Sequence, residues 1–167
     1  MIKGKKGIIF GIANDHSIAW GIAKQLHLNG AELVITYQNK TLLKRVKPLA
    51  EKVRADTLIE CDVSNEIHIQ NTVDQVQNKF GTIDFIIHAV AYSDKNELNG
   101  RYLETTKENF INSLSISCYS FTKIAKYFQP IINNGGSLIT LSFYGANKVM
   151  PNYNVMGVAK AALEASV

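Results

Sequence analysis

A tyrosine and a lysine seven residues apart are the residues whose types and spacing most clearly allow chemistry. Tyr153 and Lys160 stand in the segment YNVMGVAK. Seven helical residues make nearly two turns, so both side chains would lie about 20° apart on one helix face. Pro151 suits the first turn of that helix. A lysine ammonium near a phenol favours the phenolate and improves the tyrosine as a proton donor. The spacing by itself also fits an exposed lysine and a half-buried tyrosine with no relation.

A glycine-containing turn after the first apolar run could hold the phosphates of a dinucleotide. Gly11 would let the backbone turn close to a ligand, and Gly21 would let the next helix approach the sheet. Ser17 can cap that helix and donate its hydroxyl to phosphate, next to the free N–H groups of a helix N-terminus. The segment is not a GxGxxG fingerprint, so an ordinary strand-to-helix turn is the alternative.

Polar residues follow the next two apolar runs. Gln38 offers a neutral amide where an acidic residue commonly holds the adenosine ribose, which favours NADH, while Lys40 and Lys44 leave NADPH open. Asp62 could accept a hydrogen bond from the adenine amino group. The alternative is that Asp62 or Ser64 only caps the following helix.

These residues need elements to position them, and apolar runs alternate with helical patterns along the whole chain. Ile18, Ile22 and Leu26 recur every four residues, and Gly30 and Gly81 follow two helical segments as left-handed caps. Strand–helix alternation implies right-handed crossovers and a parallel sheet with helices on both faces. We therefore predict an α/β, Rossmann-type doubly wound fold in one domain over residues 1–167. Strands are expected at 7–10, 32–36, 57–61, 84–88 and 137–141.

Composition limits the remaining classes. The 167 residues are 46% hydrophobic with a net charge of +4, and no apolar run approaches the roughly 20 residues of a membrane-spanning helix. Two cysteines without a CxxC pair and four histidines without ligand spacing predict a cytoplasmic protein with no metal site. The cations of residues 40–54 indicate a solvated helix face, or else an anionic partner, and we expect no nucleic acid. Residues 152–167 have a helical pattern that continues to the last residue without a cap or stop signal, so we expect the chain to be truncated at its C-terminus.

Several segments, taken in order, resemble one family. They are Gly11 with SIAWGIA from Ser17, Tyr37-Gln38-Asn39, Cys61-Asp62-Val63 and Pro151 to Lys160. Together they closely resemble the bacterial enoyl-acyl-carrier-protein reductases of the short-chain dehydrogenase/reductase superfamily. The Tyr-x6-Lys spacing is distinctive, because most of the superfamily uses Tyr-x3-Lys.

The resemblance implies a function in bacterial fatty acid elongation. NADH would deliver hydride to C3 of a trans-2-enoyl thioester carried by acyl carrier protein. Tyr153 would hydrogen-bond the developing enolate oxygen, and Lys160 would bind the nicotinamide ribose. A homotetramer built around long helices such as 107–128 is also implied. The family's cofactor-contact positions match Gly11, Ser17, Ile18, Gln38, Asp62, Val63 and Val90, and its substrate-side positions match Ala91 and Ser93.

Two departures and two alternatives remain. Many members carry a second tyrosine where this chain has Phe143, and members continue well beyond this length. A β-ketoacyl or other carbonyl reductase would place a tyrosine four residues before Lys160, where Met156 stands instead. A dinucleotide-binding module without catalysis is the other alternative.

Overall fold

A computed structural model describes residues 2–167, which form two compact units. The sheet unit comprises the chain up to Ala89 together with Ala125–Thr140, and the helical unit comprises Val90–Ile124 and Leu141–Val167.

The sheet unit holds five parallel strands in the order β3-β2-β1-β4-β5. β1, β2 and β4 consist largely of apolar residues and are buried over nearly their whole length, as in a sheet covered on both faces. The predicted doubly wound parallel fold is thereby confirmed. The strands are β1 (Lys6–Phe10), β2 (Glu32–Tyr37), β3 (Thr57–Glu60), β4 (Ile83–His88) and β5 (Ile132–Thr140).

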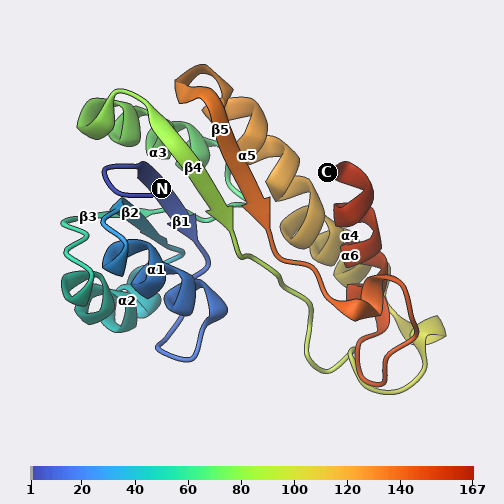
Figure 1. Ribbon diagram of the computed structural model, residues 1–167. Coiled ribbons are helices and arrows are strands. Elements are labelled where there is room, and N and C mark those ends of the chain that lie inside the picture. The colour runs from blue at the N-terminus through green and yellow to red at the C-terminus, as the bar shows by residue number, and fades with distance from the viewer. Residues whose placement is uncertain (1) are drawn as a thin grey trace. The chain divides into compact units, whose positions relative to one another are not determined.

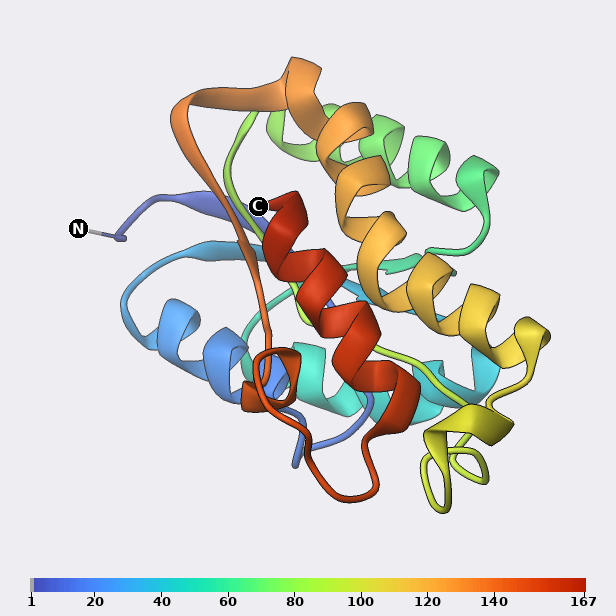
Figure 2. The ribbon, with the colours of Figure 1, turned by 90° about the vertical axis from the view of Figure 1, so that its right-hand side faces the viewer.

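Helices cover both faces of this sheet (Figure 2). On one face α1 (Ile18–Leu28) and α2 (Lys40–Lys52) pack over a core that contains Ile9 and Ile35. On the other face lies α3 (Glu66–Phe80), and Phe10 meets Phe128 edge-on with ring centroids 6.0 Å apart.

Strand and helix ends follow the predicted positions closely, with one marked difference. Gly30 and Gly81 both have positive φ, +83° after α1 and +73° after α3. Gly81 has a ψ of −66°, outside the left-handed helical region, so the prediction that it is a left-handed cap is wrong. β5 begins at Ile132 rather than 137 because its ladder with β4 contains an irregularity between the pairs Ile83–Ile132 and Phe85–Ser137. The added residues of this bulge include Gly135, with φ +80°.

The helical unit is built on a long helix and on the chain's last helix, which lie side by side (Figure 1). The expected long helix 107–128 is present as α4 (Lys107–Leu114), a π-helical turn η2 (Ser115–Tyr119) and α5 (Ser120–Phe128) without a break. The last helix is α6 (Asn154–Ser166), preceded by the short 3-10 turn η4 (Tyr144–Ala146). Two further 3-10 turns are η1 (Tyr102–Glu104) and η3 (Gln129–Ile131). No helix within residues 2–167 has the length and apolar character needed to cross a membrane.

Candidate active site

The predicted site residues divide between the two units. The sheet unit carries Gly11, Ser17, Ile18, Gln38, Asp62 and Val63, most of them just beyond the carboxyl ends of β1, β2 and β3. This edge is where open α/β sheets bind their ligands. The helical unit carries Val90, Ala91, Ser93, Tyr153 and Lys160.

Gly11 allows a close backbone approach directly after β1. Its φ is +103°, and a Cβ atom there would lie 2.0 Å from the carbonyl oxygen of Ala89. No other residue type fits this position without displacing the backbone that follows β4. Gly21 is different, because a Cβ atom added there would meet nothing within 4 Å. The expectation that Gly21 permits close helix–sheet packing is therefore wrong.

Ser17 organises the loop between β1 and α1. It is the N-cap residue of α1, but its hydroxyl makes no capping bond to that helix, contrary to expectation. Instead Oγ accepts hydrogen bonds from the backbone N–H groups of Ala13 and Asn14, both at 3.1 Å. Ile18, the first residue of α1, is 70% exposed. The helix N-terminus and this ordered loop together form a candidate phosphate cradle.

Gln38 and Asp62 meet at the ends of β2 and β3. The amide of Gln38 donates to Oδ2 of Asp62 at 3.2 Å, while Oδ1 accepts from the N–H and hydroxyl of Ser64. Burial raises the pKa of Asp62, but the hydrogen bonds from Ser64 and Gln38 outweigh it and lower the pKa overall. Asp62 does not cap α3, because Asn65 fills that role. Asp62 is thus an ionised acceptor at neutral pH. Val63 next to it is buried.

Tyr153 precedes α6 instead of lying within it. The helix begins at Asn154, and Tyr153 is its N-cap residue. Pro151 therefore lies in the preceding turn and not in the first helical turn, so that part of the prediction is wrong. Asn152 and Asn154 on either side of Tyr153 have positive φ of +57° and +31°.

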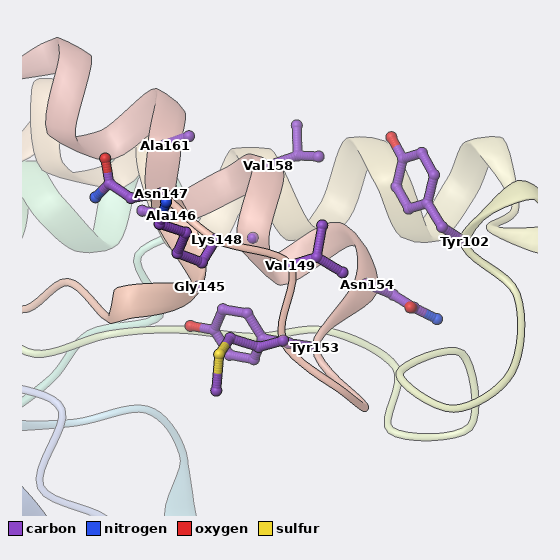
Figure 3. Close-up of a pocket in the computed structure, with 12 residues that line it drawn as sticks. Tyr102, Gly145, Ala146, Asn147, Lys148, Val149, Tyr153, Asn154, Val158 and Ala161 are labelled. Carbon is purple, nitrogen blue, oxygen red and sulfur yellow. The ribbon is translucent and has the colours of Figure 1, made fainter.

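The Tyr153 ring packs in a confined setting. The ring of Phe143 lies 4.8 Å away at an angle of 62°, and a Cβ on Gly145 would lie 2.5 Å from the Tyr153 ring. Phe143 thus supports the tyrosine by contact. A cavity of about 450 Å³ adjoins this ring, as Figure 3 shows, lined by Tyr102, the segment from Gly145 to Met150, Tyr153, Asn154, Gly157, Val158 and Ala161.

Lys160 is buried, with 6% of its surface exposed, and its Nζ donates to the carbonyl oxygen of Leu141 at 2.8 Å. Burial lowers the pKa of Lys160, with the Cys118 thiol acting in the opposite direction. Burial also raises the pKa of Tyr153. The sequence-based expectation that Lys160 favours the Tyr153 phenolate is not met here, because the ammonium is directed at Leu141.

The loop after β4 carries Val90, a predicted cofactor contact, and the predicted substrate-side residues Ala91 and Ser93. Val90 and Ser93 are half-buried and Ala91 is exposed. The Ser93 hydroxyl exchanges hydrogen bonds with the buried Asn109 on α4. Sequence reasoning missed Asn109, and the available signal was a polar residue within an apolar helical pattern.

Comparison with known proteins agrees over the whole chain. A family model described as enoyl-(acyl carrier protein) reductase matches residues 11–167. The NADH-dependent enoyl-[acyl-carrier-protein] reductase 2 of Rhizobium meliloti is 54% identical over all of this chain and 62% of its own length. The FabI protein of Rickettsia bellii is 56% identical over all of this chain and 64% of its own length.

Solved structures show the same fold. The enoyl-acyl-carrier-protein reductase of Anaplasma phagocytophilum, in complex with NAD, has a TM-score of 0.97 and 55% identity over 99% of this chain and 64% of its own. The Aquifex aeolicus reductase has a TM-score of 0.97 and 42% identity over 99% of this chain and 66% of its own. The chain spans less than two thirds of the curated relatives it matches. On the family match from Gly11 to the last residue, this chain belongs to the enoyl-(acyl carrier protein) reductase family.

Proposed function

We propose that this chain is the NADH-binding and catalytic part of an enoyl-acyl-carrier-protein reductase in fatty acid synthesis. Its substrate would be a trans-2-enoyl thioester, and its product the saturated thioester. The observation that carries the proposal is the pair formed by Tyr153, the N-cap residue of α6, and Lys160, which is buried within that helix. Both lie in the segment 11–167 that matches the family. The relatives named above are NADH-dependent by their names.

The residues of the sheet unit fit a dinucleotide. Gly11 leaves its backbone free of a side chain, the Ser17 loop orders the N-terminus of α1, and Asp62 presents an ionised carboxylate beside Gln38. A neutral glutamine at the end of β2 supports NADH over NADPH. We assign cofactor contacts to Gly11, Ser17, Ile18, Gln38, Asp62, Val63, Val90 and Lys160.

Bound NADH would supply the hydride that C3 of the enoyl group takes up. The electron pair of the double bond then moves toward the thioester oxygen, and Tyr153 donates a hydrogen bond to that oxygen as its charge develops. Because burial raises its pKa, the Tyr153 hydroxyl stays protonated at neutral pH and is available as a donor. A proton taken up from solvent at C2 would complete the reduction. Ala91 and Ser93 are assigned to the substrate side.

The best test is removal of one hydroxyl. Tyr153→Phe should lower kcat by about 100- to 1,000-fold, because a donor to a developing oxyanion is lost, with NADH affinity unchanged within about twofold. Tyr144→Phe is the matched control, since Tyr144 is 62% exposed on the neighbouring turn. Steady-state reduction of an enoyl thioester and NADH fluorescence titration give both numbers. Unchanged turnover in Tyr153→Phe would contradict the mechanism and favour a non-catalytic dinucleotide module.

A carbonyl reductase of the same superfamily is the second candidate activity. It needs a tyrosine four residues before Lys160, where the buried Met156 has no proton to donate. A β-ketoacyl thioester should therefore not be reduced under conditions in which the enoyl thioester is.

We further propose a homotetramer in the cytoplasm, acting on acyl carrier protein. Ile111 and Tyr119 on the long helix are more than half exposed in the single chain. Large apolar side chains exposed in this way would be buried if the long helix packed against a second subunit. Both cysteines are free thiols, as is usual in a reducing compartment. Gel filtration of the full-length protein tests the assembly, and a stable monomer would contradict it.

A further inference from the structure

A buried asparagine gathers the loop that follows β4. Asn109 on α4 is 5% exposed, and its Oδ1 accepts from the Asp94 N–H at 2.9 Å and from the Ser93 and Ser113 hydroxyls at 3.2 Å. Its Nδ2 donates to Ser93 Oγ at 3.1 Å and to Glu97 Oε2 at 3.2 Å. The hydrogen-bonding capacity of this side chain is thus used almost entirely to hold residues 93–97.

Glu97, which accepts a hydrogen bond from Asn109, is itself held by the residue that caps α4. Its carboxylate accepts from the Thr106 N–H at 2.9 Å and from the Thr106 hydroxyl at 2.8 Å, besides the Asn109 amide. These hydrogen bonds, that of the Thr106 N–H first, lower the pKa of Glu97, so the group remains an ionised acceptor. Because Asn109 of α4 and Thr106, the N-cap of that helix, hold the Glu97 side chain, the backbone carbonyl of Glu97 has a defined position.

Asn154 binds that carbonyl. Its side-chain amide donates to the Glu97 oxygen at 2.8 Å and lies 3.4 Å from the Asn99 oxygen. Asn154 also has φ +31°, a left-handed value at the very start of α6 and directly after Tyr153. Such a conformation costs free energy for a residue with a side chain and persists where the surroundings hold it.

We infer that Asn154 is a positioning residue for Tyr153, and that Asn109 and Glu97 hold the carbonyl to which it binds. This inference rests on the role proposed above for Tyr153. The φ of Asn154, with the preceding peptide, sets the direction in which the Tyr153 side chain leaves the backbone. The hydrogen bond to Glu97 therefore fixes the tyrosine relative to the loop that carries Ala91 and Ser93. A displacement near 1 Å in such a constellation lowers a rate by about 100-fold.

Asn154→Gly separates positioning from strain. Glycine adopts φ +31° freely, so folding stability should be retained while the tie to Glu97 is lost. We expect kcat to fall by about 10- to 100-fold, with NADH affinity and the KM of the enoyl thioester within about twofold. Asn96→Ala, an exposed position of the same loop, is the matched control. Unchanged kcat in Asn154→Gly would overturn the inference.

Exchange of partners tests the rest of the chain of contacts. Asn109→Asp places a carboxylate against Glu97 and should lower kcat. Adding Glu97→Gln removes the repulsion between the two carboxylates and offers an amide donor to the carboxylate at position 109. The same oxygen of Glu97 also accepts from the Thr106 N–H, so the double variant should recover only part of the loss. A double variant no better than Asn109→Asp would mean that the contact does not transmit position.

Hydrogen–deuterium exchange decides the coupling independently of turnover. In the full-length protein, Asn109→Ala should speed amide exchange in residues 93–99 and also in residues 154–158, with β1 unchanged. Faster exchange in the loop alone would overturn the coupling. If Asn109→Ala shows this coupling but the wild-type protein reduces no enoyl thioester, the proposed function is refuted and the positional coupling stands.

Discussion

At the scale of single residues, burial determines what Tyr153 and Lys160 can do. It raises the pKa of the phenol and lowers the pKa of the amine, so both shifts favour the neutral side chains. For the tyrosine this preserves the proton that a hydrogen-bond donor needs. Residue type and spacing made both residues candidates, and the family resemblance gave them their expected roles. Their surroundings were not predictable, since the Leu141 carbonyl that binds Lys160 is contributed by a segment 19 positions away.

Cys61 gives a prediction at this scale. It is 4% exposed, and burial raises the pKa of its thiol to about 11. Since the thiolate is the reactive form, Cys61 should resist N-ethylmaleimide at pH 8 in the folded protein and react fully after denaturation. Peptide mass spectrometry after timed labelling measures this. Rapid labelling of Cys61 under native conditions would show that the end of β3 opens readily.

At the scale of elements, helix periodicity and apolar runs predicted where most helices and strands lie. The start of α6 was misplaced for two reasons. Proline is common in the first turn of a helix, which made Pro151 a natural choice. The sequence also does not reveal that Asn152 and Asn154 adopt left-handed backbone conformations. The same limit applies to η2, where a π-helical turn interrupts a helix of continuous apolar pattern. Its Ser117 hydroxyl binds the backbone N–H and carbonyl of Tyr92, which only the folded chain brings near.

Two helical glycines should respond oppositely to alanine. Gly21 in α1 has open space in the direction of a Cβ, so Gly21→Ala should raise the free energy of unfolding by about 0.5–1 kcal/mol through helix propensity. At Gly157 in α6 a Cβ would lie 2.8 Å from the Gly145 carbonyl oxygen, so Gly157→Ala should destabilise by about 1–3 kcal/mol. Urea denaturation compares the pair. Stabilisation by Gly157→Ala would contradict the close packing of η4 on α6.

At the scale of the whole molecule, the order of apolar runs and helical patterns predicted the parallel doubly wound sheet correctly. The division into a sheet unit and a helical unit was not predicted from the sequence, because it depends on which residues far apart in the chain pack together. The ion pair between Lys5 and Asp84 was equally unpredictable from the sequence. Asp84 at the start of β4 accepts hydrogen bonds from the Lys5 ammonium, the Lys6 N–H and the Asn133 amide.

This ion pair predicts a pH dependence of stability. The hydrogen bond from Lys5, with those from Lys6 and Asn133, lowers the pKa of Asp84 below its unfolded value of about 3.9. Its stabilisation is therefore complete above that value and is lost as pH falls through the folded-state pKa. Asp84→Asn should lower the free energy of unfolding by about 1–2 kcal/mol at pH 7, and the difference from wild type should vanish in acid. Asp74→Asn, at an exposed position of α3, is the control, and a pH-independent difference would contradict the assignment.

One mixing experiment decides whether this chain belongs to a working enoyl reductase, as we propose. Full-length protein is mixed with NADH and then with a trans-2-enoyl thioester of acyl carrier protein, while nicotinamide fluorescence is followed and the thioester is analysed by mass spectrometry. We predict a fluorescence change on NADH binding, then a decay as NADH is oxidised, with one saturated thioester formed per NADH consumed. Stable NADH fluorescence with the enoyl thioester intact would contradict the claim.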